Sequence, residues 1–371
     1  MSRRKKMKYK TVLAGLGARG KIHLKGILEN PDRFELSGIY DPSPEAIKIV
    51  RDRFNINCVY SSAEEMLSKT KPDVLVFATH PEIRMEYIDL GIKYGVKGIA
   101  FEKPMAVTLA DAREMTKKCL DNNIRAIVSH QQKYLKQMQK MYACVNSGIL
   151  GPVEMIRIFM LAWASQLGTH FIDYALWANN GVGAEWVVGH VSGKNKLYDN
   201  HPSPDYMMGE AKLKNGARLI IEGGYLAPQV IPDERFWCNN RITVYGPHGY
   251  AWAETDGRCG FFSNDTNGKV DIHQFPKWDV QAMDIQTPYY ADFADWLDND
   301  RKKHPCNIEI SLHGFEIMEG LFRSALGNTR VDLPIQGNIP DSIAEMKKIL
   351  PEEKYPEGFM ESQFFRLGHR V

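Results

Sequence analysis

The chain has 371 residues, of which 44% are hydrophobic and 25% are charged. This length exceeds the usual size of one hydrophobic core, so we expect two domains. The net charge is only +2 and the basic residues are scattered apart from Arg3-Arg4-Lys5-Lys6, so the composition gives no reason to expect a nucleic-acid partner.

A glycine-rich turn follows the first expected strand. Residues Tyr9–Ala14 are apolar and β-branched, which favours a strand, and a helix is expected over Lys21–Glu29. The pattern between them is G-x-G-x-x-G: its glycines permit a tight turn, close approach of a pyrophosphate, and close packing of helix on strand. The residues expected to bind the cofactor in this turn are Gly15, Gly17, Ala18, Arg19 and Gly20.

A carboxylate ends the second expected strand. This strand covers Phe34–Tyr40 and is followed by Asp41, about 20 residues after the glycine-rich turn. An acidic residue at this spacing accepts hydrogen bonds from the ribose hydroxyls of a bound dinucleotide. Because Asp41 would repel a 2′-phosphate, and Pro42-Ser43-Pro44 offers no arginine to attract one, we expect NAD rather than NADP.

Strands and helices continue to alternate up to residue 130. Further strands are expected around Cys58–Tyr60, Pro72–Thr79, Val96–Ala100 and Arg125–Ser129. Helices are expected at Pro44–Phe54, after a cap at Ser61 or Ser62, at Pro81–Tyr94 and at Leu109–Asn122. This order predicts an α/β Rossmann domain, a doubly wound parallel sheet, over residues 1–130.

Polar residues mark the ends of two of these strands. Open α/β sheets bind ligands at the carboxyl ends of their strands, so Thr79 and His80 are expected near the cofactor, although His80 also suits a structural turn. Glu102-Lys103-Pro104 ends the next strand, and Glu102 and Lys103 are also expected to contact the cofactor. Proline favours an extended conformation in the residue before it, so Lys103 would sit on a stiff turn where Glu102 could tune its ammonium group; the alternative is an ordinary solvated lysine.

The second half differs, because short strands are separated by hairpin turns. After a helix expected over Tyr134–Asn146, strands are expected at Val153–Ala162, Val187–Ser192, Tyr206–Leu213, Arg218–Tyr225, Arg241–Tyr245 and Tyr250–Glu254. Helices are expected at Phe171–Trp177, Pro288–Lys303 and Leu312–Leu326. We predict an α+β domain with an open, mostly antiparallel sheet over 131–335. A C-terminal extension, 336–371, would pack on this domain or on a neighbouring subunit.

The order of these motifs resembles the glucose-fructose oxidoreductase, inositol dehydrogenase and MocA family of NAD(P)-dependent sugar and polyol oxidoreductases. The resemblance rests on the glycine-rich turn, Asp41, the strand ending in Thr79 and the Glu102-Lys103-Pro104 turn. Similar family segments downstream are Ser147–Val153, Gly168–Asp173, Ser324-Ala325 and Val331–Pro334. The resemblance covers roughly residues 8–335, and it implies a homo-oligomer formed through the open sheet.

The resemblance implies two catalytic residues. Lys103 would lie between nicotinamide and substrate, and His170 would contact the substrate hydroxyl as general base, a role that suits an ordinary histidine pKa near ~6.5. Asp173 would orient His170 or face the core. Family members commonly carry an aspartate where this chain has Gln166. Glutamine can bond a sugar hydroxyl but cannot take its proton, so proton transfer would fall to His170 and Lys103.

Three more side chains are expected to bind substrate. Gln131 and Lys133 follow the last strand of the Rossmann sheet, at its ligand edge. Trp163 could stack on a sugar ring, with packing in the core or an interface as its alternative.

These residues predict an NAD-dependent dehydrogenase that acts on a CH–OH group of a sugar, cyclitol or sugar conjugate. Alternatives are a redox-neutral NAD-dependent glycosidase or lyase that acts through a transient keto-sugar, and a non-catalytic NAD-binding sensor. No metal is expected, because no ligand spacing such as H-E-x-x-H occurs. Six separated cysteines without a C-x-x-C pair favour a reduced, cytoplasmic protein, and no apolar run suggests a membrane partner.

Overall fold

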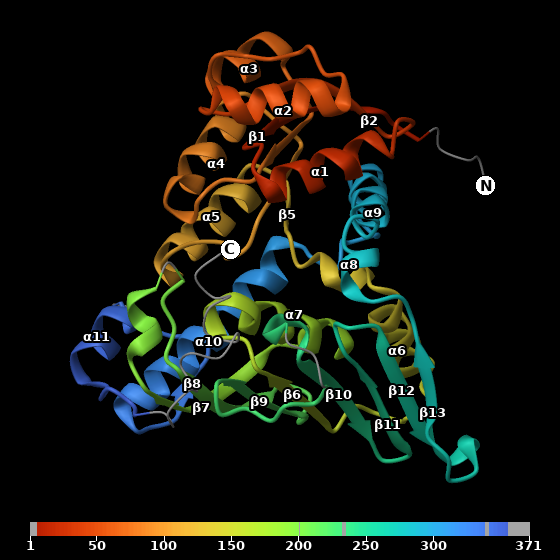
Figure 1. Ribbon diagram of the computed structural model, residues 1–371, viewed down its shortest axis with the longest axis vertical. Helices are drawn as coiled ribbons and strands as arrows, with labels where there is room; N and C mark the ends of the chain where they lie inside the picture. The colour runs from red at the N-terminus through yellow and green to blue at the C-terminus, as the bar shows by residue number, and fades with distance from the viewer. Residues whose placement is uncertain (1–5, 200, 232–234, 338–340, 355–371) are drawn as a thin grey trace. The chain divides into compact units, whose positions relative to one another are not determined.

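The computed structural model describes residues 6–199, 201–231, 235–337 and 341–354 (Figure 1). The chain divides into two compact units. The first takes its residues from Met1–Tyr134 and Asp279–Leu312, and the second from Leu135–Trp278 and His313–Val371. Residues 279–312 therefore belong to the first unit, whereas the sequence analysis expected them in the second domain.

The first unit contains the expected parallel sheet. Its strand order is β2-β1-β3-β4-β5, and all four pairings are parallel. The strands are β1 (Tyr9–Ala14), β2 (Phe34–Tyr40), β3 (Val74–Phe77), β4 (Gly98–Phe101) and β5 (Arg125–Val128). All residues of β3 and β4 are buried, as expected for strands covered on both faces. The segment expected as a strand around Cys58–Tyr60 forms only an isolated bridge between Ile39 and Val59.

Helices connect these strands close to the expected positions. They are α1 (Ala18–Leu28), α2 (Pro44–Phe54), α3 (Ala63–Thr70), α4 (Arg84–Lys93) and α5 (Leu109–Asp121). The hydroxyl of Ser62 caps α3 by accepting from the Glu65 amide at 3.0 Å, which settles the choice between Ser61 and Ser62. A short 3₁₀ helix, η1 (Pro81–Ile83), precedes α4, so the segment expected as one helix divides in two.

A late helix, α9 (Gln286–Asp298), packs within the first unit. Gly26 of α1 makes this possible, since a Cβ there would lie 2.7 Å from the Tyr290 ring. Arg33 donates to Asp295 at 2.6 Å and to Asp298 at 2.7 Å, which ties α9 to the start of β2. These contacts join segments more than 250 positions apart, so no local pattern in the sequence could reveal them.

The second unit contains a nine-stranded sheet within the described residues. Its strand order is β13-β12-β11-β10-β6-β9-β8-β7-β14, in which β6 and β9 are parallel and the other neighbours are antiparallel. The strands are β6 (Met155–Met160), β7 (Ala184–Ser192), β8 (Tyr206–Leu213), β9 (Arg218–Gly224), β10 (Asn240–Gly246), β11 (Gly249–Ala253), β12 (Arg258–Ser263), β13 (Asp271–Gln274) and β14 (Val331–Asp332). The expected mostly antiparallel sheet is confirmed, and β12, β13 and β14 extend it.

Helices cover one face of this sheet. The helix α6 (Lys136–Asn146) packs on β11 and β12, and α10 (Ile308–Gly327) approaches so closely that a Cβ on Gly189 would lie 2.3 Å from the Leu321 carbonyl oxygen. The opposite face exposes Val188 of β7 and Met208 of β8. Among the described residues, the sheet therefore has one face buried by helices and one face with exposed apolar side chains.

Part of the C-terminal extension is helical. The helix α11 (Ser342–Ile349) contacts η4 (Asn195–Tyr198) of the second unit, and the Ser342 hydroxyl donates to Glu319 at 2.5 Å. Residues 355–371 of the predicted extension lie outside the described residues. Among the helices that are described, none is long and apolar enough to cross a membrane.

Candidate active site

The glycine-rich turn has the geometry that its spacing predicts. Gly15 has φ of +85°, and a Cβ there would lie 2.5 Å from the Ala78 carbonyl oxygen. A Cβ on Gly20 would lie 1.9 Å from the Gly15 carbonyl oxygen. Gly17 differs, because a Cβ there would meet no atom within 4 Å. Gly15 and Gly20 therefore allow close packing, and Gly17 borders open space.

The surroundings of this turn fit a dinucleotide. No side chain caps the N-terminus of α1, so its first N–H groups remain available to a phosphate. Asp41 accepts from the Leu16 amide at 2.6 Å and from the Ser43 amide at 2.8 Å. A carboxylate has about four acceptor positions, so Asp41 can also accept from ribose hydroxyls. The open space at Gly17, the uncapped helix and Asp41 together suit NAD.

Thr79 and His80 follow β3 but differ in environment. The Thr79 hydroxyl oxygen is buried and lacks a hydrogen-bond partner among the described residues, which suits a polar group awaiting a ligand. His80 is exposed and precedes the proline that opens η1. Thr79 therefore stays a predicted neighbour of the cofactor. The position of His80 before η1 suits the structural turn that the sequence analysis gave as its alternative role.

Arg19 and Glu102, both predicted to bind the cofactor, form an ion pair with one another. The Arg19 Nε donates to Glu102 Oε1 at 2.8 Å, and the buried His23 Nε2 lies 3.1 Å from the same oxygen. The His23 Nδ1 lies 2.8 Å from the Tyr290 hydroxyl. Although burial alone would raise the pKa of Glu102, the Arg19 guanidinium and the His23 ring hold it well below its usual range. Glu102 is therefore ionised.

Lys103 follows this carboxylate on a half-buried turn, and its bond to Pro104 is cis. Burial lowers the pKa of the Lys103 amine from 10.5 to about 8, Glu102 opposes this decrease, and the positive charges of Arg19 and Arg84 add to it. The amine therefore titrates close to neutral pH. An amine of this kind at a strand end can donate to an oxygen that gains negative charge during a reaction.

Gln131 and Lys133 lie on the 3₁₀ helix η2 (Gln131–Tyr134), and both are buried. The Gln131 amide fits with its oxygen 2.5 Å from Arg19 Nη2 and its nitrogen 2.7 Å from the Ser129 carbonyl oxygen. The Lys133 Nζ donates to the Pro305 carbonyl at 2.6 Å. Gln131 thus extends the Arg19–Glu102 pair, and Lys133 ties η2 to the segment that precedes α10.

His170 lies in the second unit, near the start of α7 (Thr169–Ala178). A single turn of π-helix, η3 (Ala164–Gly168), leads into α7, and such turns are frequent at functional sites. The His170 Nδ1 lies 3.0 Å from the Tyr174 hydroxyl, within hydrogen-bond distance. Asp173 is fully buried. Lys103 belongs to the first unit and His170 to the second.

Trp163 precedes the π-turn, and Gln166 lies within it. The Lys196 Nζ lies 4.2 Å from the centre of the Trp163 ring, and the Tyr225 and Phe236 rings lie 5.2 and 4.8 Å away. Trp163 is only 3% exposed. Side chains of its own unit therefore surround this ring, which favours the packing alternative. Gln166 is half-buried.

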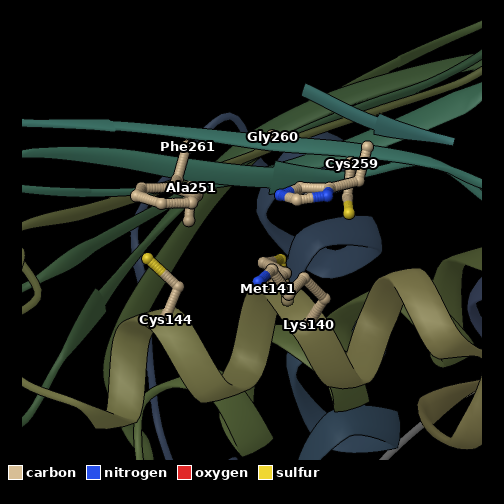
Figure 2. A pocket seen from close by; sticks show the side chains of 8 residues that line it. Lys140, Met141, Cys144, Ala251, Cys259, Gly260 and Phe261 are labelled. Atoms are coloured by element: carbon tan, nitrogen blue, oxygen red, sulfur yellow. The ribbon is translucent and has the colours of Figure 1, made fainter. Parts of the chain in front are cut away.

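The second unit contains two hollows that are lined by other residues than the predicted site residues. Figure 2 shows one between α6 and the β11–β12 strands, where Cys144 and Met141 face Cys259 and Phe261. It has no room for a water molecule, so it is a packing gap. The other has a volume of about 450 Å³ and is lined by Ile231, Asp256, Arg258, Gln274, Phe275, Pro276 and Lys277. No predicted site residue lines either hollow.

Across the ranges that the structure describes, no group of three or more His, Cys, Asp or Glu side chains is placed to hold a metal ion.

Three residues of the first-unit site escaped the sequence analysis: His23, Tyr290 and Arg84. His23 lies one helical turn after Arg19, a spacing that places both on one face of α1 and could have suggested a shared partner. Tyr290 lies on α9, far away in the sequence. Arg84 is 2% exposed, and its guanidinium donates to the backbone carbonyls of Thr79 and Pro104. The spacing of side chains in the sequence does not reveal such bonds to the backbone.

Sequence comparisons with known proteins match the part of the chain that forms the parallel sheet of the first unit. Residues 9–130 match a family model described as an oxidoreductase family with an NAD-binding Rossmann fold. An uncharacterised oxidoreductase of Streptococcus pneumoniae is 26% identical over 139 residues, 38% of this chain and 37% of that protein. A D-apiose dehydrogenase of Paraburkholderia graminis is 27% identical over 144 residues, 39% of this chain and 38% of that protein. The matches thus span less than two fifths of these relatives.

Solved structures resemble both units. An oxidoreductase of Agrobacterium radiobacter, in complex with NAD⁺, L-tartaric acid and magnesium, has a TM-score of 0.74 at 18% identity and covers 88% of this chain and 98% of its own. The WlbA dehydrogenase of Bordetella pertussis, in complex with NADH and UDP-GlcNAcA, has a TM-score of 0.68 at 22% identity. The match covers 89% of this chain and 100% of that chain. The transcriptional regulator Gal80p of Kluyveromyces lactis has a TM-score of 0.72 at 14% identity. The match covers 90% of this chain and 96% of that chain.

At these identities the structural likeness establishes the fold, and the family model establishes the domain that binds NAD. The match of residues 9–130 to an NAD-binding Rossmann fold agrees with the predicted cofactor. Residues 9–130 of this chain therefore match the NAD-binding domain of the Gfo/Idh/MocA oxidoreductase family.

Proposed function

We propose that this protein transfers a hydride between NAD and a secondary hydroxyl of a sugar, cyclitol or sugar conjugate. The observation that carries the proposal is the position of Lys103 on the turn after β4, in the same unit as the glycine-rich turn. Burial there lowers the pKa of its amine to about 8. The D-apiose dehydrogenase and WlbA, a dehydrogenase solved with a sugar nucleotide, support a carbohydrate substrate.

In this proposal Lys103 stabilises negative charge. Because its pKa is about 8, most Lys103 side chains carry a proton at pH 7 and can donate a hydrogen bond to the substrate oxygen. The charge on that oxygen grows as the carbinol proton leaves, so the bond strengthens toward the transition state. Bound NAD supplies the hydride acceptor, and the ion-paired Glu102 keeps the turn in place.

His170 is the proposed general base. Its Nδ1 lies 3.0 Å from the Tyr174 hydroxyl, and Nε2 is the atom that would take the carbinol proton. Gln166 would bond a neighbouring substrate hydroxyl, and Asp173 would support the start of α7. The surroundings of Trp163, Gln131 and Lys133 favour supporting roles for these three residues, rather than the direct substrate contacts that the sequence suggested.

Two further expectations concern the state of the protein. We propose that the open face of the second-unit sheet forms a homo-oligomer, because Val188 and Met208 on neighbouring strands expose apolar side chains there at 44% and 46%. Light scattering of the wild type and of Met208→Lys tests this: the variant should have the lower mass, and equal masses would contradict it. A cytoplasmic location stays a prediction that rests on the wide spacing of the six cysteines in the sequence.

The test of the proposed function is a substrate screen. Purified protein is mixed with NAD and with monosaccharides, cyclitols and glycosides, and both NADH and sugar products are measured. Accumulation of NADH with at least one compound is expected. Glycoside cleavage without net NADH would instead identify a redox-neutral glycosidase or lyase, and NAD binding without any turnover would identify a sensor.

A further inference from the structure

Arg84 occupies an unusual position for a buried arginine. It begins α4, is 2% exposed, and turns its guanidinium toward backbone carbonyls. Its Nε and Nη2 donate to the Thr79 carbonyl at 3.2 and 2.7 Å. Its Nη1 donates to the Pro104 carbonyl, and Nη2 lies 3.5 Å from the Lys103 carbonyl oxygen. One side chain thus joins the segment after β3 to the turn after β4.

The charge of Arg84 has no carboxylate partner at ion-pair distance within the described part of the chain. Arg33, a second buried arginine among the described residues of this unit, pairs with Asp295 and Asp298. A buried cation without an acidic partner is costly, and here carbonyl dipoles replace that partner. Burial lowers the pKa of Arg84 only to about 10, so the group is still charged at neutral pH.

We propose that Arg84 is the positioning residue of the catalytic turn, holding the carbonyls of Lys103 and Pro104 so that the Lys103 amine is presented in one orientation. The assignment rests on the proposed role of Lys103. The planar fork of arginine suits this role, because a single group must reach carbonyls on the segment after β3 and on the turn after β4, and a lysine could not supply that geometry.

The same group acts on Lys103 through its charge. The charged groups that influence the amine are Glu102 on the turn, Arg19 on α1 and Arg84 on α4. Glu102 favours the protonated amine, whereas the two arginines oppose it. Removal of the Arg84 charge should therefore raise the pKa of Lys103. A purely structural arginine would affect stability without moving this titration.

The test measures the Lys103 amine directly and needs no substrate. Wild type, Arg84→Gln, Arg84→Lys and the control Arg33→Gln are labelled briefly with acetic anhydride over a range of pH, and mass spectrometry quantifies modification of Lys103. In Arg84→Gln, labelling at pH 8 should fall about two- to fivefold as the amine becomes more protonated. Arg33→Gln and the charge-conserving Arg84→Lys should follow the wild-type profile.

Turnover and stability complete the test. Arg84→Lys should lower kcat about 10- to 100-fold with KM within about threefold, because the amine keeps its charge but loses its fixed orientation. Wild-type kcat in Arg84→Lys, or an unchanged labelling profile in a folded Arg84→Gln, would overturn the assignment. If the wild type proves inactive with every sugar while the labelling profile still shifts, the proposed reaction fails and the link between Arg84 and Lys103 stands.

Discussion

The Lys103 turn of the first unit and the start of α7 in the second hold their titratable groups by different means. Lys103 adjoins Glu102, which is ionised and bonded to Arg19 and His23. His170 belongs to a helix in which every residue from Thr169 to Ala178 is buried. Charged neighbours can tune a pKa as well as fix a position, whereas apolar packing mainly fixes position. The first unit should therefore be the more sensitive to single charge changes.

Removal of the amine should have the largest effect. Lys103→Met should lower turnover on the order of 10²- to 10⁴-fold, because the developing oxygen charge loses its donor, while NAD affinity changes little. Steady-state kinetics and calorimetric NAD binding measure the two quantities. The control is Lys117→Met, at an exposed lysine on α5. Turnover within a factor of three of the wild type would remove Lys103 from the mechanism.

Replacement of His170 tests whether the second unit supplies the general base. His170→Asn should lower turnover about 10²-fold or more, since asparagine cannot accept the carbinol proton. A matched change is His190→Asn on the exposed part of β7, which should leave turnover unchanged. If the two variants retain similar activity, the base lies elsewhere.

Neutralising the buried carboxylate separates stability from catalysis. Glu102→Gln leaves Arg19 and His23 without their shared acceptor, so the free energy of unfolding should fall by about 2–4 kcal/mol. The pKa of Lys103 should fall as well, because Glu102 favours the protonated amine. Urea denaturation measures the stability change, with the exposed Glu64→Gln as control. Equal midpoints for both variants would mean that the network contributes no stability.

Sequence reasoning reached much of the first unit because its determinants are local. The glycine spacing, Asp41 after β2 and the proline after Lys103 each act within a few residues. It could not foresee that α9 packs within this unit, or that Tyr290 reaches His23, because those contacts depend on long-range packing. Trp163 illustrates the same limit, since a lone aromatic residue does not indicate which side chains surround it.

Removal of the ribose acceptor should affect the cofactor. Asp41→Ala should raise the Kd for NAD about 10- to 100-fold and reduce discrimination against NADP, because a charged acceptor and its repulsion of a 2′-phosphate are both lost. Fluorescence titration with each cofactor measures this. Asp52→Ala, at an exposed position on α2, is the control. Unchanged NAD affinity in Asp41→Ala would contradict the assignment of Asp41.

The smallest effect is expected where apolar packing already fixes the group. Tyr174→Phe removes the hydroxyl next to His170 Nδ1 and keeps the ring, so turnover should fall only about 2- to 10-fold. A loss as large as that of His170→Asn would show that the hydroxyl, and not the packing of α7, holds the base.

The most direct measurement of the central claim is the pH dependence of NADH formation by the wild type and by Lys103→Arg. The wild-type kcat should fall as the pH rises through about 8, because Lys103 loses the proton that it donates to the substrate oxygen. An arginine stays protonated over this range, so whatever activity Lys103→Arg retains should lack this decrease. The same decrease in the variant, or no NADH from the wild type with any carbohydrate, would contradict the account.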